Sequence, residues 1–241
     1  MIDRKLCGWD IEIYKDIEQG EDWLDLVPLG ITVGAMAYAD GAAPYTWHAG
    51  YTSPQNVPHN GQMSQQEASI MVDELQRFVD AGYTLVTWNG LAFDFRVLAI
   101  ESGRYADCAR IALNHIDMMF HVVCAKGFGV GLDTVAKTMN LAGKTEGMSG
   151  ALAPKMWRDG EFDKVLEYVT QDAVSTVEVA IACEKAKAMR WTTRAGKESR
   201  MPLRNGWLRV RDALLLSVPD TSWMDDPSVW DRKRFLEWTE A

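Results

Sequence analysis

Two carboxylates, Asp10 and Glu12, stand two residues apart in the segment GWDIEIYK (residues 8–15), which otherwise reads as a buried strand. Side chains alternate between the faces of a strand, so both carboxylates point the same way, while Ile11 and Ile13 point into a core. Two like charges on one face repel each other unless a cation lies between them. The pair is therefore a candidate cation site, and the alternative is a solvated strand face.

Three further side chains have positions that suit chemistry. Asp94 comes six residues after a strand expected at 83–88, and strand ends are where sites assemble in open α/β sheets. An acid at the start of a helix also simply complements the helix dipole. Tyr168 and Asp172 stand four apart in an expected long helix, so they share one helical face. Each feature alone is compatible with an ordinary surface, and only the combination points to a site.

The elements that must hold these residues follow from the spacing of apolar residues. Strands are expected at 4–14, 29–39, 44–49, 83–88 and, as a short fifth strand, 111–117. Helices are expected at 64–80, 92–103, 131–140 and 161–188. The first helix begins with a capping box, Ser64 and Glu67. Three consecutive strands followed by alternating helices and strands predict an α/β fold, with a mixed sheet of about five strands, the first three antiparallel, flanked by helices.

Composition sets the class of protein. The chain has 241 residues, of which 47% are hydrophobic, so it can bury a large core. The first residues, MIDRKLCGWD, are too charged for a signal peptide, and no apolar run approaches the length of a membrane span. The four cysteines are scattered with no C-x-x-C pair, which argues against a zinc site or a disulfide framework. Scattered cysteines are also typical of a protein in the reducing cytoplasm, so a cytoplasmic location is expected. His115 and His121 flank Asp117 without metal-ligand spacing and are expected to be structural.

Charge is distributed unevenly along the chain. The net charge is −9, yet residues 185–211 hold nine Lys or Arg and one acid, Glu198. An acidic body could therefore host a metal site, while the basic segment could hold a polyanion. Within this segment "RAGKE" (194–198) predicts a hairpin turn between short strands. Its tryptophans, Trp191 and Trp207, are expected to pack on the main body, since large aromatic side chains usually serve packing.

Taken together, the D-x-E of the first strand, "NGLAFD" after the fourth and Y-x-x-x-D in the late helix resemble the DEDD 3′–5′ exonucleases of the ribonuclease H-like fold. The tyrosine subtype is implied, because the histidine subtype needs His where this chain has Glu167. The resemblance covers about residues 4–185 and is closest to the exonuclease domains of family B DNA polymerases. It implies an exonuclease domain over 1–188 and a basic, Trp-bearing extension over 189–241.

The resemblance also implies roles for the site residues. Oxygen-only ligands suit Mg²⁺ or Mn²⁺, and two such ions about 4 Å apart serve phosphodiester hydrolysis. Asp10 would bridge both ions, Glu12 and Asp172 would complete the site of the ion on the nucleophile side, and Asp94 would hold the second. Tyr168 would orient the attacking water.

The expected activity is release of nucleoside 5′-monophosphates from a 3′ end, with DNA more favoured than RNA as the substrate. Alternatives are an RNA-processing exonuclease, a non-catalytic nucleic-acid-binding module and a structural domain of a larger assembly. The extension could instead contact a protein partner. The side chains expected to contact substrate are Asn89, Lys144, Arg194, Lys197, Arg200 and Arg204.

Overall fold

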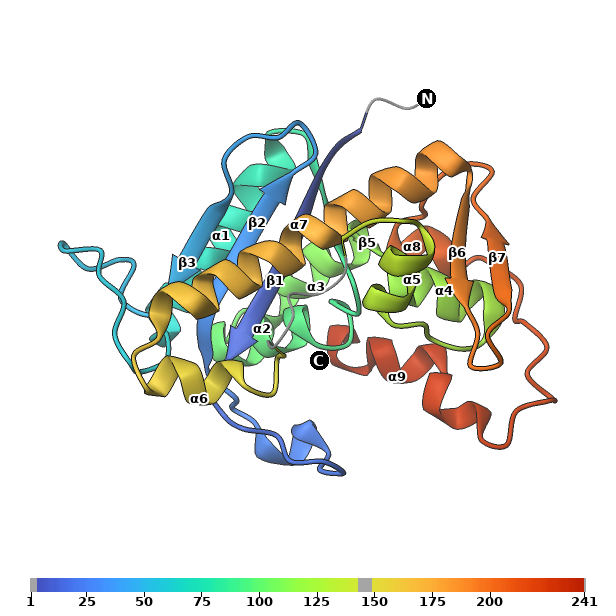
Figure 1. Cartoon of the computed structure of the whole chain (residues 1–241). Coiled ribbons are helices and arrows are strands. Elements are labelled where there is room, and N and C mark those ends of the chain that lie inside the picture. The colour runs from blue at the N-terminus through green and yellow to red at the C-terminus, as the bar shows by residue number, and fades with distance from the viewer. Residues whose placement is uncertain (1–3, 143–148, 241) are drawn as a thin grey trace.

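A five-stranded mixed sheet forms the centre of the molecule in a computed structural model that describes residues 4–142 and 149–240 (Figure 1). Its strands in chain order are β1 (Lys5–Ile13), β2 (Ile31–Tyr38), β3 (Tyr45–His48), β4 (Tyr83–Thr87) and β5 (Ile116–Asp117). The spatial order is β3-β2-β1-β4-β5, with β1, β2 and β3 antiparallel and with β4 and β5 added parallel to β1. The expected fold class is therefore confirmed, and β1 lies at the centre of the sheet.

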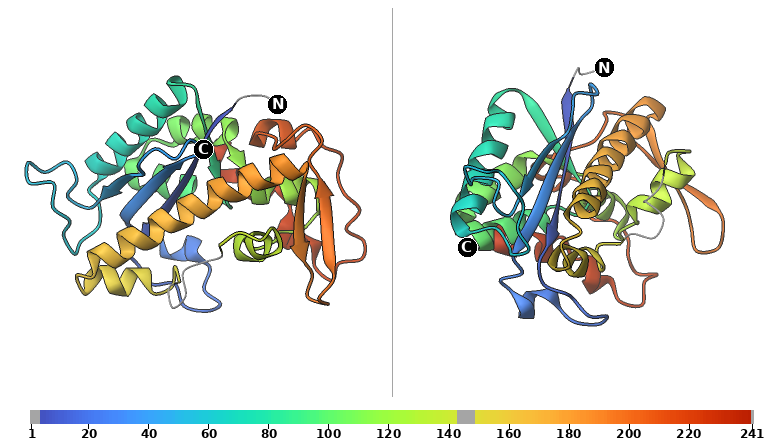
Figure 2. Two further views of the ribbon diagram at one scale, coloured as in Figure 1. Left: turned by 45° about the horizontal axis from the view of Figure 1, so that its top comes forward. Right: turned by 60° about the vertical axis from the view of Figure 1, so that its left-hand side comes forward.

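Helices cover both faces of this sheet. The long helix α7 (Phe162–Ala186) crosses one face, against β1 and β2. Helices α1 (Gln65–Asp80), α2 (Asp94–Ser102) and α3 (Tyr105–Asn114) lie on the other face, as the edge-on view of Figure 2 shows. The capping box of α1 is present, with the Glu67 backbone N donating to Ser64 Oγ at 3.2 Å and Ser64 N donating to Glu67 Oε2 at 2.8 Å.

The fifth strand differs from the expectation. Most of the expected strand 111–117 is the end of α3, and only Ile116 and Asp117 pair with β4. Cys108, Ile111 and Ala112 are buried at helical spacing, which explains why this segment extends a helix and not a strand.

Three other helices complete the middle of the chain. They are α4 (Met118–Lys126), α5 (Leu132–Thr138) and α6 (Ala153–Arg158). Of these, only α5 was expected from the sequence. The short helices α4 and α6 carry several apolar residues in few turns, so their periodicity is weak.

The C-terminal part packs onto the same hydrophobic core. It consists of the hairpin β6 (Ala188–Thr192) and β7 (Glu198–Pro202), then α8 (Val210–Ala213), the 3₁₀ helix η2 (Pro227–Trp230), α9 (Arg232–Leu236) and the 3₁₀ helix η3 (Glu237–Glu240). The predicted hairpin is confirmed. Trp191 and Trp207 are buried in the core, as expected for packing residues. Trp238 is buried there as well, whereas Trp223 is 64% exposed. The boundary at residue 188 stays a prediction.

The described helices include none that is both long and apolar enough to cross a membrane. All four cysteines are free and buried.

Candidate active site

Glycine at position 8 brings the long helix against the acidic face of β1. A Cβ at Gly8 would lie 2.1 Å from the backbone oxygen of Ala173 in α7, so only glycine fits this crossing. Asp10 and Glu12 follow on the same face of the strand. On the other face Trp9 packs against Phe95 of α2, with ring centroids 4.6 Å apart. The alternation expected from the sequence therefore holds, and the acidic face meets α7.

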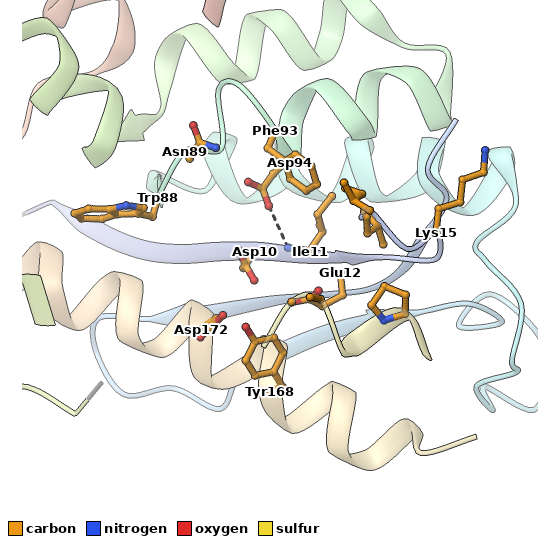
Figure 3. Close-up of a pocket in the computed structure, with 15 residues that line it drawn as sticks. Asp10, Ile11, Glu12, Lys15, Trp88, Asn89, Phe93, Asp94, Tyr168 and Asp172 are labelled. Atoms are coloured by element: carbon orange, nitrogen blue, oxygen red, sulfur yellow. Dashed lines mark hydrogen bonds between the residues drawn. The ribbon is translucent and has the colours of Figure 1, made fainter. Parts of the chain in front are cut away.

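That helix contributes the other half of an acidic cluster. Carboxylate oxygens of Asp10, Glu12 and Asp172 lie within 4.8 Å of one another. Tyr168, one turn before Asp172, points toward the same cluster (Figure 3). Glu12 and Asp172 are each 7% exposed and Tyr168 is 2% exposed. The structure thus brings together four of the five residues expected to do chemistry.

The Tyr168 phenol keeps its proton at neutral pH. Burial raises its pKa above the ordinary value, and the negative charges of Asp172 and Glu12 raise it further. A protonated phenol donates a hydrogen bond and does not act as a base.

Asp94 lies in the same cavity but on the opposite side of the β1 backbone (Figure 3). It is the first residue of α2, is 4% exposed and accepts a hydrogen bond from the Ile11 backbone N at its Oδ1, at 3.3 Å. Burial raises the pKa of Asp94 to about 7, and the charge of Asp117 adds to this effect. Asp94 is therefore adjacent to the three clustered carboxylates and not one of them.

A fifth carboxylate, Asp117, is buried and holds the loop that leads into Asp94. Its Oδ1 accepts hydrogen bonds from the backbone N of Asn89 and of Phe120, both at 3.0 Å, and its Oδ2 accepts one from Leu91 N at 2.9 Å. Burial raises the pKa of this carboxyl as well. The sequence analysis noted Asp117 only as the residue between His115 and His121 and assigned it no role. Its position at the end of β5, directly before α4, is the feature that could have marked it as a site residue.

The cavity has a volume of about 320 Å³, and its lining includes Asp10, Glu12, Asp94, Tyr168 and Asp172 but not Asp117. Its lining comes from β1, the segment after it, the loop after β4, the start of α6 and the first half of α7. Asn89, expected to contact substrate, lines this cavity and adopts a positive φ of 74°. Across residues 4–142 and 149–240, Lys15 is the one cation in the lining, and its Nζ donates to Leu26 O at 2.8 Å.

The cations expected to contact substrate lie elsewhere. None of the hairpin-region residues Arg194, Lys197, Arg200 and Arg204 lines the cavity. The hairpin follows the C-terminal end of α7, and residue 186 is roughly 21 Å along the helix from residue 172. A substrate would therefore have to extend beyond the cavity to reach them. Lys144 falls outside the described residues.

The donor set suits a divalent cation. Three carboxylates this close repel one another, and that repulsion is relieved when a cation binds between them. Carboxylate oxygens are the ligands of hard ions such as Mg²⁺ and Mn²⁺. Asp10, Glu12 and Asp172 would hold such an ion, with Asp94 close by.

Comparison with known proteins addresses the family. No curated protein matches the sequence. Among solved structures, the family B DNA polymerase from the hyperthermophilic archaeon Pyrobaculum calidifontis is similar with a TM-score of 0.49 and 16% identity, over 76% of this chain and 24% of that one. This chain therefore spans about a quarter of that polymerase.

A family model provides the assignment. The model described as the RNase_H superfamily matches residues 45–183, from β3 to near the end of α7. The match contains Asp94, Tyr168 and Asp172, and the sheet then adds the two acids of β1. The family model matches more than half of the chain, and the structure has a mixed five-stranded sheet whose central strand carries part of a carboxylate cluster. This chain therefore belongs to the RNase_H superfamily.

Proposed function

We propose that this protein is a metal-dependent 3′–5′ exonuclease that hydrolyses DNA from single-stranded 3′ ends and releases nucleoside 5′-monophosphates. The observation that carries the proposal is the cluster of Asp10, Glu12 and Asp172, with Tyr168 beside it, in one cavity. The family membership supports nuclease chemistry, and the order of the motifs along the chain supports the 3′–5′ direction.

Two Mg²⁺ or Mn²⁺ ions are the proposed cofactors. Asp10, Glu12 and Asp172 would ligate the first, and Asp10 together with Asp94 would hold the second. Bound divalent ions would lower the pKa of the attacking water and neutralise charge that develops on the phosphate. The raised pKa of Asp94 fits this role, because a nearby cation would favour its ionised form.

The protein's own groups would orient the substrate. Tyr168 keeps its proton, so it would donate a hydrogen bond to the attacking water or to a phosphate oxygen and thereby fix the line of attack. Asn89 would contact the terminal nucleotide from the loop after β4, because it lines the cavity. Asp117 would act through this loop by holding its backbone.

The C-terminal extension, residues 189–241, is proposed to hold the strand outside the cavity. The hairpin side chains of Arg194, Lys197 and Arg200 are exposed, as is Arg204 after the hairpin. An acidic body needs positive surface to admit a polyanion to a carboxylate site. The four buried, free cysteines fit action in the reducing cytoplasm.

The test uses purified full-length protein with Mg²⁺ or Mn²⁺ and 5′-labelled single-stranded DNA, duplex DNA and RNA. Progressive shortening from the 3′ end with release of nucleoside 5′-monophosphates is the expected result. Asp10→Ala should lower the rate at least about a thousandfold, since it removes the shared ligand. Glu167→Ala is the matched control, because Glu167 is exposed on the same helix as Tyr168.

Other outcomes would redirect the proposal. Activity on RNA alone would indicate an exoribonuclease, and binding without hydrolysis would indicate a nucleic-acid-binding module. Asp10→Ala within tenfold of the unaltered protein would refute the site assignment.

A further inference from the structure

The connection between β1 and β2 forms a compact loop beside the cavity. Its ends are adjacent, because Tyr14 N donates to Gly30 O and Lys15 N to Leu29 O, both at 3.0 Å. Between these ends lies the 3₁₀ helix η1 (Trp23–Leu26), the blue segment below the end of β1 in Figure 1. Compact loops with closed ends that pack on their own side chains are frequently functional. We refer to residues 15–29 as the wall loop.

The wall loop is anchored on several sides. At its start, Arg158 of α6 donates to Tyr14 O at 2.6 Å and forms an ion pair with Asp16 at 2.5 Å. The bond from Lys15 Nζ to Leu26 O ties the start of the loop to η1. Lys15 and Ile17 contribute directly to the cavity lining. The loop therefore has a defined position and forms one side of the cavity.

Trp23 connects this loop to the residue before Asp94. Its ring meets the ring of Phe93 edge-on, with centroids 5.1 Å apart and an interplanar angle of 69°. The guanidinium carbon of Arg96 lies 5.6 Å from the Trp23 ring centroid. Trp23 itself is not part of the cavity lining, whereas Phe93 is. Trp23 therefore contacts the cavity lining through the ring of Phe93.

We propose that Trp23 is a positioning residue that holds Phe93 as the surface on which the 3′-terminal base of the substrate rests. This inference rests on the proposed exonuclease function. Edge-to-face aromatic pairs and a cation over an indole each favour one arrangement of the rings. Phe93 thus presents a fixed ring to the cavity that the carboxylate cluster also lines.

The size of the cavity matches this role. At about 320 Å³ it lies at the low end of cavities that hold small ligands, roughly 300–1,000 Å³. Its size is therefore compatible with one bound nucleotide unit. A base stacked on an aromatic side chain gains on the order of 1–3 kcal/mol, whatever its identity. A fixed Phe93 would therefore bind any unpaired terminal nucleotide and orient its phosphate toward the carboxylates.

The test couples a change in the protein to a change in the substrate. Nuclease kinetics on single-stranded DNA are compared for two variants of the site, Trp23→Ala and Trp23→Phe. The control is Trp223→Ala, which alters an exposed tryptophan. A second substrate has the same sequence with an abasic 3′-terminal residue. Trp23→Ala should raise KM about tenfold on normal DNA, with kcat within about threefold, and Trp23→Phe should recover most of the loss. On abasic DNA, Trp23→Ala should change KM less than about twofold, because the base that Phe93 contacts is missing.

The outcomes separate this inference from the proposed function. Absence of nuclease activity in the unaltered protein would overturn the function. An active protein in which Trp23→Ala raises KM equally on both DNAs, or on neither, would overturn the role of Trp23 alone. Thermal melting of each variant identifies any that fails to fold. If Trp23→Ala does not fold, Trp23→Leu, which keeps an apolar side chain but removes the aromatic ring against Phe93, takes its place and should show the same dependence on the terminal base.

Discussion

At the scale of single residues, the hydroxyl of Tyr168 gives a direct prediction. Because the phenol is protonated and we propose that it orients water and does not ligate an ion, Tyr168→Phe should slow hydrolysis roughly ten- to a thousandfold and leave cation binding intact. The rate is measured in single-turnover hydrolysis of labelled DNA. Cation binding is measured as the rise in melting temperature when Mg²⁺ or Mn²⁺ is added, since an ion held by the cluster would bind the folded chain and not the unfolded one.

Asp172→Asn is the comparison for that variant. It removes one charge from the cluster, so it should reduce the metal-dependent rise in melting temperature. If Tyr168→Phe also lost this rise, the phenol would be part of the ion site and its assigned role would be wrong.

A buried histidine gives a pH prediction. His115 contacts Thr87 Oγ1 through Nε2 at 2.9 Å, and burial lowers its pKa from about 6.5 to about 4. The unfolded chain binds a proton at this group below pH 6.5 and the folded chain does not, so stability present above pH 6.5 is lost as the pH falls toward 4. Urea unfolding at pH 7.5 and pH 5 should show the native protein losing about 2 kcal/mol more than His115→Gln. Equal losses would show that His115 is protonated in the fold.

Short-range spacing explains which site residues the sequence revealed. Asp10 with Glu12, and Tyr168 with Asp172, are each fixed by the period of one element, so their shared faces could be predicted. Asp117 and Trp23 act through backbone groups and rings of distant segments. No local period encodes such contacts, and these two roles appear only in the structure.

At the scale of elements, the crossing of β1 and α7 controls the site. Gly8→Ala would place a methyl group 2.1 Å from Ala173 O, a backbone atom, so α7 must move. We expect a loss of about 1–3 kcal/mol or more in the free energy of unfolding, and loss of metal-dependent stabilisation because Asp172 moves with the helix. Urea unfolding with and without Mg²⁺ measures both effects.

Gly131→Ala is the matched control for this prediction. Gly131 has an ordinary φ of −73°, and the nearest side chain would be 3.7 Å from an added Cβ. Gly131→Ala should leave the free energy of unfolding and the metal-dependent stabilisation nearly unchanged. If Gly8→Ala behaved in the same way, the close crossing would not position the site.

Helices and strands were predicted correctly from the sequence where the periodic pattern of apolar residues continues over many residues. The helices at 65–80 and 162–186 and the central strands were expected within a few residues of their observed bounds. The segment 111–117 was misassigned because its apolar run is too short to distinguish a helix end from a strand.

At the scale of the whole molecule, the C-terminal end supports the loop of the site. Trp238 donates from Nε1 to Leu91 O at 2.8 Å, while Leu91 N donates to Asp117. Trp238→Phe keeps an aromatic ring but leaves a buried carbonyl without its donor, which should cost about 1–3 kcal/mol of stability. Activity should fall with it, because this loop carries Asn89 and leads into Asp94. Trp223→Phe, at an exposed site in the same extension, is the control.

The uneven charge of the whole chain gives the last prediction. If Arg194, Lys197, Arg200 and Arg204 hold the strand outside the cavity, changing all four to Gln should raise KM several-fold and leave turnover at saturation nearly unchanged. The slope of log affinity against log salt should flatten by about 0.7 for each lost contact with a single strand. Changing Arg77, Arg110, Lys137 and Lys164 to Gln removes the same charge from exposed positions of helices outside the C-terminal extension and is the control. The same loss in both quadruple variants would mean that net charge alone matters. An unaltered affinity and salt slope in the first variant would mean that this segment faces solvent or a protein partner.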